Sequence, residues 1–94
     1  MKMRELVRYK MIFTGRVQGV GFRYKASHVA NEYRLTGYVK NEYDGSVTVE
    51  IQGTEQEIYM FLKALGHDRY IDIYNLEKIR IPLEDDERSF IVQY

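Results

Sequence analysis

Hydrophobic residues recur along the chain at two spacings, one typical of strands and one typical of helices. Between residues 7 and 14 they occupy every second position, which predicts a strand with one face toward the core. These residues are Val7, Tyr9, Met11 and Phe13. Two other stretches repeat at intervals of three and four residues, which predicts amphipathic helices. The first contains Phe22, Ala26, Val29, Ala30 and Tyr33, and the second contains Ile58, Phe61, Leu62 and Leu65.

A hairpin is predicted in the middle of the chain. The segment Tyr43-Asp44-Gly45 contains Asp-Gly, which is one of the strongest short-range signals for a tight turn between strands. Residues 36–42 and 46–52 flank this turn and alternate as strands do. We therefore predict that these two strands pair in the antiparallel direction.

The second helix and the strands after it are marked by their end signals. Thr54 followed three residues later by Glu57 predicts a capping box, and Gly66 is the expected residue just after the helix. Residues 71–81 alternate imperfectly, which predicts a strand with a bulge near Asn75. A short terminal strand is predicted from the alternation of Phe90, Val92 and Tyr94.

The order of these elements indicates the fold class. Strand, helix, strand, strand, helix and strand, with a short terminal strand, is the split βαβ arrangement of ferredoxin-like folds. We expect an α+β sandwich in which two helices cover one face of an antiparallel sheet, and residues 1–94 forming a single domain. Because this fold supports many unrelated functions, the function must come from particular residues.

Composition excludes several kinds of chemistry. The chain has 94 residues and no cysteine, so disulfides, thiolate metal sites and cysteine nucleophiles are excluded. His28 and His67 stand alone without carboxylates at ligand spacing, and no metal site is expected. The first residues lack the apolar run of a signal peptide, and no stretch approaches the ~20 apolar residues of a membrane span. A cytoplasmic location is therefore expected.

Charge is unevenly distributed although the net charge is zero. Residues 1–25 contain seven lysines and arginines, and Glu5 is the only acidic residue among them. A locally basic surface on a neutral protein suits a small anion better than a nucleic acid, which requires an extended basic patch. Scattered solvated basic residues would explain part of the same excess.

The segment from Gly15 to Arg23 joins the first strand to the first helix and is rich in glycine. Glycine allows successive backbone N–H groups to converge, and a helix N-terminus adds unpaired donors and partial positive charge. We therefore predict a phosphate-binding loop, with a tight connecting turn as the alternative. The loop consists of Arg16, Val17, Gln18, Gly19, Val20, Gly21, Phe22 and Arg23.

Two side chains are candidates for chemistry at this loop. Arg23 falls in the first helical turn, and its planar fork of donors can bind two phosphate oxygens while keeping its charge. Asn41 precedes the hairpin turn and could orient a water by accepting one hydrogen bond and donating another. The alternative interpretations are a surface arginine for Arg23 and a turn-favouring asparagine for Asn41.

The pattern Gly15-x-Val17-Gln18-Gly19-Val20-x-Phe22-Arg23, followed by Gly37-Tyr38-Val39-Lys40-Asn41 and Asp44-Gly45-Ser46-Val47, resembles the acylphosphatase family. The resemblance implies an α/β sandwich that hydrolyses carboxyl-phosphate anhydrides without a metal or cofactor. It also implies that Arg23 binds phosphate together with the backbone N–H groups of the loop, and that Asn41 positions the attacking water.

Two functional hypotheses follow. The first is an acylphosphatase that releases a carboxylate and inorganic phosphate by in-line attack of water, with Arg23 and Asn41 as catalytic residues. The second is a non-catalytic phosphate- or anion-binding module of the same fold. In either case we expect a monomer whose partners are a small acyl phosphate or phosphate, and not a nucleic acid or a membrane.

Overall fold

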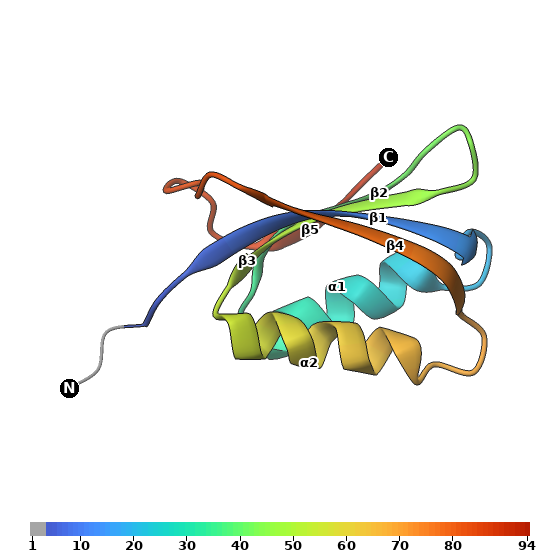
Figure 1. Cartoon of the computed structure of the whole chain (residues 1–94), viewed down its shortest axis with the longest axis horizontal. Coiled ribbons are helices and arrows are strands. Elements are labelled where there is room, and N and C mark those ends of the chain that lie inside the picture. Colours follow the sequence, from blue (N-terminus) through green and yellow to red (C-terminus); the bar gives the residue numbers. More distant parts are fainter. Residues whose placement is uncertain (1–3) are drawn as a thin grey trace.

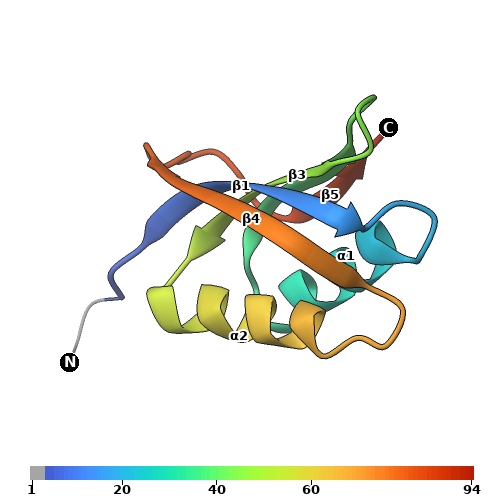
Figure 2. The same ribbon diagram turned by 45° about the vertical axis from the view of Figure 1, so that its right-hand side comes forward.

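A five-stranded sheet carries both helices on one of its faces (Figures 1 and 2). The computed structural model describes residues 4–94. Its elements are β1 (Val7–Arg16), α1 (Phe22–Glu32), β2 (Thr36–Asn41), β3 (Val47–Gly53), α2 (Glu55–Gly66), β4 (Asp72–Ile81) and β5 (Phe90–Gln93). The predicted split βαβ order is confirmed.

The strands lie in the order β4-β1-β3-β2-β5. β1 pairs antiparallel with both β3 and β4, and β2 pairs antiparallel with β3 as the hairpin signal predicts. β5 joins the outer side of β2 in the parallel direction, which makes the complete sheet mixed. The expected antiparallel sheet is thus present in four strands, and the terminal strand extends it on the far side from β4.

The hydrophobic core lies between the sheet and the helices. Met11 and Phe13 of β1 are fully buried, as their alternation predicts. The ring of Phe13 packs edge-on against Phe22 at the start of α1, with ring centroids 5.0 Å apart. Burial of each such side chain stabilises the fold by about 1.5–3 kcal/mol. This contact also determines where α1 begins relative to β1.

The two ends of α2 differ in how well the sequence predicts them. The capping box is present, because Thr54 Oγ1 accepts a hydrogen bond from Glu57 N at 3.2 Å and Glu57 Oε1 accepts one from Thr54 N at 3.1 Å. The prediction that Gly66 follows the helix is wrong. Gly66 is the last helical residue, and His67 closes the helix in a right-handed conformation by donating to the Lys63 carbonyl at 3.1 Å.

The bulge predicted near Asn75 is confirmed. The register of β1 against β4 shifts between Thr14 and Gly15, which leaves Tyr74 as an additional residue in β4. Gly15 has φ 136°, and a Cβ at this position would lie 2.3 Å from the carbonyl oxygen of Asp72. Only glycine fits so close to the neighbouring backbone.

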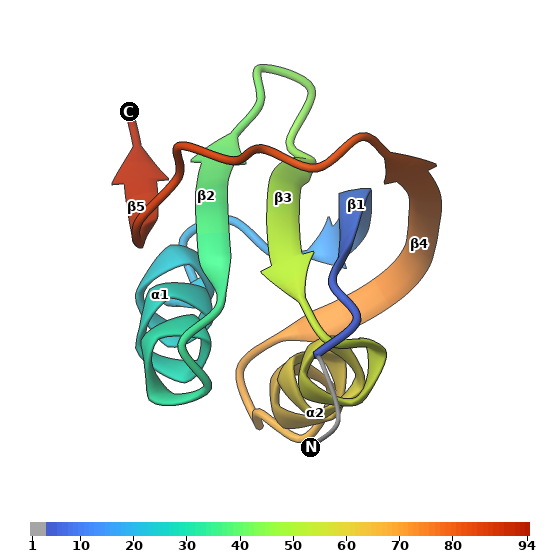
Figure 3. The ribbon, with the colours of Figure 1, turned by 90° about the vertical axis from the view of Figure 1, so that its left-hand side faces the viewer.

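Residues 82–89 cross the whole sheet, because β4 and β5 lie at opposite edges. Figure 3 shows this crossing segment on the face of the sheet opposite the helices. Arg8 of β1 holds it in place and is itself only 2% exposed. Its guanidinium donates to both carboxylate oxygens of Glu87, at 2.6 and 3.1 Å, and to Glu50 Oε1 at 3.0 Å. A two-pronged contact of this kind is among the stronger charged hydrogen bonds.

Gln52 provides a second attachment for the crossing segment. Its amide nitrogen donates to the Glu84 carbonyl at 3.1 Å, and its amide oxygen accepts from Glu84 N at 2.8 Å. Burial alone would lower the pKa of Arg8, but its hydrogen bonds with Glu87 and Glu50 outweigh burial and raise the pKa. Arg8 therefore stays charged.

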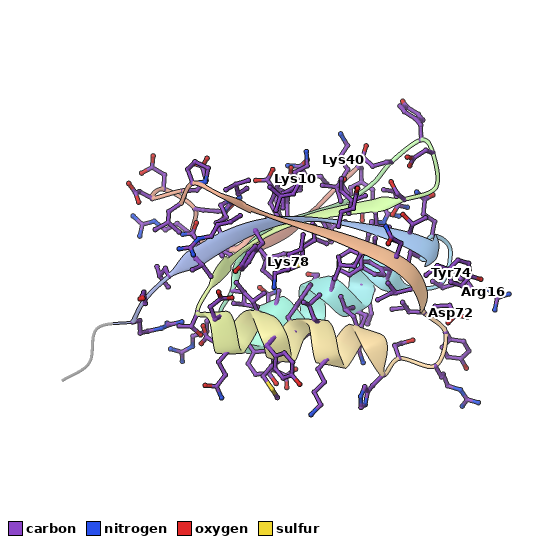
Figure 4. The ribbon with its side chains drawn as sticks, in the orientation of Figure 1. Lys10, Arg16, Lys40, Asp72, Tyr74 and Lys78 are labelled. Carbon is purple, nitrogen blue, oxygen red and sulfur yellow. The ribbon has the colours of Figure 1, made fainter. Side chains whose placement is uncertain are left out.

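We expect Arg8→Met to lower the free energy of unfolding by about 2–4 kcal/mol, because it leaves the carboxylates of Glu50 and Glu87 without their partner. The loss is below that for a fully enclosed pair since both carboxylates are partly exposed. Lys10→Met is the matched control, because Lys10 projects from the same face two residues further along β1 (Figure 4). Urea unfolding measures both, and equal losses would contradict the role given to Arg8.

Tyr38 makes stability depend on alkaline pH. Its hydroxyl donates to Glu50 Oε2 at 2.9 Å, and burial together with this hydrogen bond raises its pKa to about 12. Because the unfolded chain ionises first, near the ordinary tyrosine pKa of about 10, the contribution of Tyr38 is complete below pH ~10 and lost as the pH rises toward 12.

We therefore expect Tyr38→Phe to be less stable than the parent by about 1 kcal/mol at pH 8, the usual value of one hydrogen bond. This difference should shrink between pH 10 and 12, measured by urea unfolding at each pH. Tyr59→Phe, at an exposed tyrosine of α2, should follow the parent throughout. A Tyr38→Phe difference that stays constant up to pH 12 would contradict the assignment.

Candidate active site

A cavity of about 320 Å³ lies where the loop after β1, the start of α1 and the ends of β2 and β5 meet. It brings together Arg23 and Asn41, the two residues that the sequence singles out. Its lining consists of Val17, Gly19, Gly21, Phe22, Arg23, Tyr24, Ser27, Asn41, Val92 and Tyr94.

The loop turns into α1 through two glycines in the left-handed region, Gly19 with φ 72° and Gly21 with φ 83°. Gly21 is the N-cap of α1, and no side chain forms a capping hydrogen bond there. The first turn of the helix contains no acidic residue. The N–H groups of a first turn have no partner within the helix, so these donors and the positive end of the helix dipole are available to an anion at the cavity.

Gln18 connects the loop to the β2–β3 hairpin. Its amide nitrogen donates to the carbonyls of Glu42 and Ser46, at 2.8 and 2.9 Å. The hairpin is itself closed by Asp44 Oδ1, which accepts from Ser46 Oγ at 2.6 Å and from Ser46 N at 2.9 Å. These two hydrogen bonds, the side-chain one first, lower the pKa of Asp44. The loop and the hairpin that carries Asn41 therefore form one connected unit.

Asn41 is the last residue of β2, and its side-chain oxygen is buried at the cavity. Within residues 4–94 this is the one buried side-chain polar atom that has no hydrogen-bond partner in the protein. An unsatisfied buried acceptor costs about 1–3 kcal/mol. The atom is thus suited to accept a hydrogen bond from a water or ligand hydroxyl in the cavity.

Arg23 lies in the first turn of α1, on the opposite side of the chain from the hairpin in sequence but beside Asn41 in space. Its guanidinium carbon lies 4.9 Å from the centre of the Tyr94 ring. Stacking uses the face of the guanidinium and leaves the N–H donors in its plane available. None of the ion pairs formed by residues 4–94 involves Arg23. Its charge is therefore free to bind an anion.

The eight predicted loop residues divide into two groups. Val17, Gly19, Gly21, Phe22 and Arg23 line the cavity. The side chains of the other three point elsewhere. Arg16 ends β1 and projects outward at the tip of the sheet (Figure 4), Gln18 reaches the hairpin, and Val20 packs against the core. Any contribution of these three to anion binding comes through the backbone.

Four residues of the lining are absent from the sequence prediction. Tyr24 and Ser27 lie on α1, one helical turn apart, and Val92 and Tyr94 come from β5 and its end. Helical spacing from Arg23 could have indicated Ser27, four residues on. Nothing in the sequence indicates the β5 residues, because their position depends on the parallel pairing of β5 with β2.

The fold and the cavity define a class: a ferredoxin-like sandwich with an anion-binding loop between β1 and α1 and an amide at the end of β2. Comparison with known proteins identifies the family. The acylphosphatase family model matches residues 9–92. An acylphosphatase of Clostridium acetobutylicum is 41% identical over 93% of this chain and 97% of its own length. The chain belongs to the acylphosphatase family.

Other relatives agree with this assignment. An acylphosphatase of Geobacillus kaustophilus is 38% identical over 93% of this chain and 94% of its own length. The crystal structure of acylphosphatase from Bacillus subtilis is similar with a TM-score of 0.86, 30% identity, and coverage of 94% of this chain and 99% of that one.

Two further searches of residues 4–94 gave negative results. None of the helices is both long and apolar enough to cross a membrane. No group of three or more histidines, aspartates or glutamates is arranged to hold a metal ion.

Two glycines with positive φ separate the role of the loop from backbone strain. Gly21 and Gly45 have φ 83° and 94°, and a Cβ at either would meet nothing within 4 Å. Alanine at each position should cost about 1–2 kcal/mol of stability, because the left-handed conformation disfavours a side chain. Phosphate affinity should fall only in Gly21→Ala, since Gly45 lies in the hairpin turn. Urea unfolding and calorimetric titration with phosphate measure the two effects, and an equal loss of affinity in Gly45→Ala would contradict the loop assignment.

Proposed function

We propose that this protein hydrolyses acyl phosphates at the cavity beside Arg23 and Asn41, releasing a carboxylate and inorganic phosphate. The activity follows from membership of the acylphosphatase family. The observation that supports the site is the buried, unpaired oxygen of Asn41 in a cavity that also contains the unpaired charge of Arg23. An anion-binding pocket alone would have no need of the amide.

Arg23 binds the phosphoryl group in this proposal. Its in-plane donors and the N–H groups at the start of α1 surround the phosphoryl oxygens and stabilise their charge as the transition state forms. Tyr94 limits the orientations of the guanidinium by stacking on it. Such preorganised donors require no rearrangement at the moment of reaction.

Asn41 orients the attacking water. The side-chain oxygen accepts a hydrogen bond from the water, which directs a lone pair of the water oxygen toward phosphorus. The new P–O bond forms as the bond from phosphorus to the acyl oxygen breaks, and the electron pair leaves with the carboxylate. The protons of the water remain on the phosphate product. A carboxylate leaving group has a conjugate acid with pKa near ~4, so no general acid is required.

We also propose that residues 1–94 function as one domain and as a monomer. β4 is an exposed edge strand, but it has two features that hinder pairing with another strand. These are the bulge at Tyr74 and the charged Lys78, which points toward the helix side and lies 4.4 Å from the Tyr9 ring (Figure 4). A cytoplasmic location and the absence of nucleic-acid and membrane partners stay predictions.

Two substitutions separate binding from turnover. We expect Arg23→Ala to lose detectable phosphate binding and turnover together, because it removes the only charged side chain among the described residues of the cavity lining. Asn41→Ala should keep phosphate binding and lose turnover by a factor on the order of 10²–10³, as for other single preorganised polar groups. Hydrolysis of benzoyl phosphate, followed by ultraviolet absorbance, measures turnover, and calorimetry measures phosphate binding.

Lys25→Ala is the control, because Lys25 lies two residues beyond Arg23 and pairs with Asp68 at 3.8 Å outside the cavity. It should behave as the parent. Full turnover in Asn41→Ala would refute the role of the amide. A folded parent protein that binds phosphate without hydrolysing benzoyl phosphate would instead support the non-catalytic binding module.

A further inference from the structure

The direction of in-line attack constrains where the acyl group of the substrate lies, and this inference rests on the function proposed above. In phosphoryl transfer the attacking and leaving oxygens stand on opposite sides of phosphorus. If Asn41 holds the water, the acyl oxygen lies on the side of the phosphoryl group that faces away from Asn41. The acyl group therefore extends away from the hairpin.

The surroundings of Asn41 offer two directions, and this rule excludes one of them. A second cavity, of about 480 Å³, shares Asn41 and Tyr94 with the first and extends toward the hairpin, where Lys40, Glu42 and Tyr43 line it. This cavity lies beyond Asn41 and hence on the side of the attacking water. A leaving group opposite the water cannot enter it.

The other direction leads to the exposed face of α1, where Tyr24 and Ser27 line the first cavity. These residues are three apart and so lie on the same face of the helix. Tyr24 is 76% exposed, and its ring stacks on His28 with centroids 6.0 Å apart and planes 12° from parallel. Tyr94 is already stacked on Arg23. Tyr24 is thus the aromatic ring of this cavity with a face open to a ligand.

The charges of the cavity indicate the kind of acyl group. Among the described residues that line it, Arg23 is the only charged one, and the phosphoryl group occupies that charge. A second charged group on the acyl part would find no partner there, whereas a flat apolar group can stack on Tyr24. The Ser27 hydroxyl can donate a hydrogen bond to the acyl carbonyl oxygen.

We propose that Tyr24 and Ser27 form the acyl subsite of this enzyme and that it favours acyl phosphates with a flat, apolar acyl group, such as those of aromatic acids.

The test compares benzoyl phosphate with acetyl phosphate, which share the phosphoryl group and differ in the acyl group. The measured quantity is the ratio of their kcat/KM values. Tyr24→Ala should lower this ratio about three- to tenfold, as expected for the loss of one aromatic stacking contact. Its turnover of acetyl phosphate and its inhibition by inorganic phosphate should match the parent, because neither involves the aromatic group.

Two further variants act as controls. Tyr24→Phe keeps the ring and should keep the ratio of the parent. Tyr43→Ala removes an equally exposed tyrosine from the cavity on the hairpin side and should also leave the ratio unchanged.

The outcomes separate the two proposals. An unchanged ratio in Tyr24→Ala, or a larger change in Tyr43→Ala, overturns the acyl subsite while leaving the hydrolytic function intact. A folded parent protein that hydrolyses neither substrate overturns the function itself. A ratio that falls only in Tyr24→Ala supports the subsite.

Discussion

The connection from β4 to β5 must pass over the entire sheet, and the buried guanidinium of Arg8 determines the course it takes. Arg8 projects from β1, in the middle of the sheet, and binds Glu50 on the neighbouring strand and Glu87 on the crossing segment. Because a buried charge is costly without partners, this arrangement favours one position of residues 82–89. β5 follows directly from that segment, so its pairing beside β2 depends on the same contact.

The cavity depends on this placement. β5 contributes Val92 and the chain continues to Tyr94, whose ring supports Arg23. The face of the sheet opposite the helices therefore affects the site indirectly, although none of its charged residues reaches the cavity. A disturbance at Arg8 would be transmitted through the crossing segment to the wall of the cavity.

The site itself requires few groups because the leaving group is a good one. A carboxylate departs without a proton donor, so charge stabilisation and orientation of a water account for most of the task. The protein supplies both from rigid places: a helix N-terminus, and the end of a strand in a hairpin tied to the loop by Gln18. The connection through Gln18 keeps Asn41 and Arg23 at a defined separation although they belong to different elements.

The sequence by itself determined the elements, the hairpin, the capping box of α2 and the bulge near Asn75, because each depends on interactions between residues close together in the chain. It also indicated Arg23 and Asn41, since a glycine-rich entry to a helix and an asparagine before a turn are local patterns. Gly66 was wrongly placed because the end of α2 is closed by an ordinary helical hydrogen bond of His67 instead of a left-handed glycine.

Only the tertiary structure decided the rest of the site. The parallel pairing of β5, the burial of Arg8 and the positions of Tyr24 and Tyr94 at the cavity join residues that are far apart in sequence. Such contacts follow from how the layers pack and from where the crossing segment lies, and neither quantity leaves a periodic signal in the chain. The sequence thus determined which groups could do the chemistry, and the packing of the sheet decided how they meet.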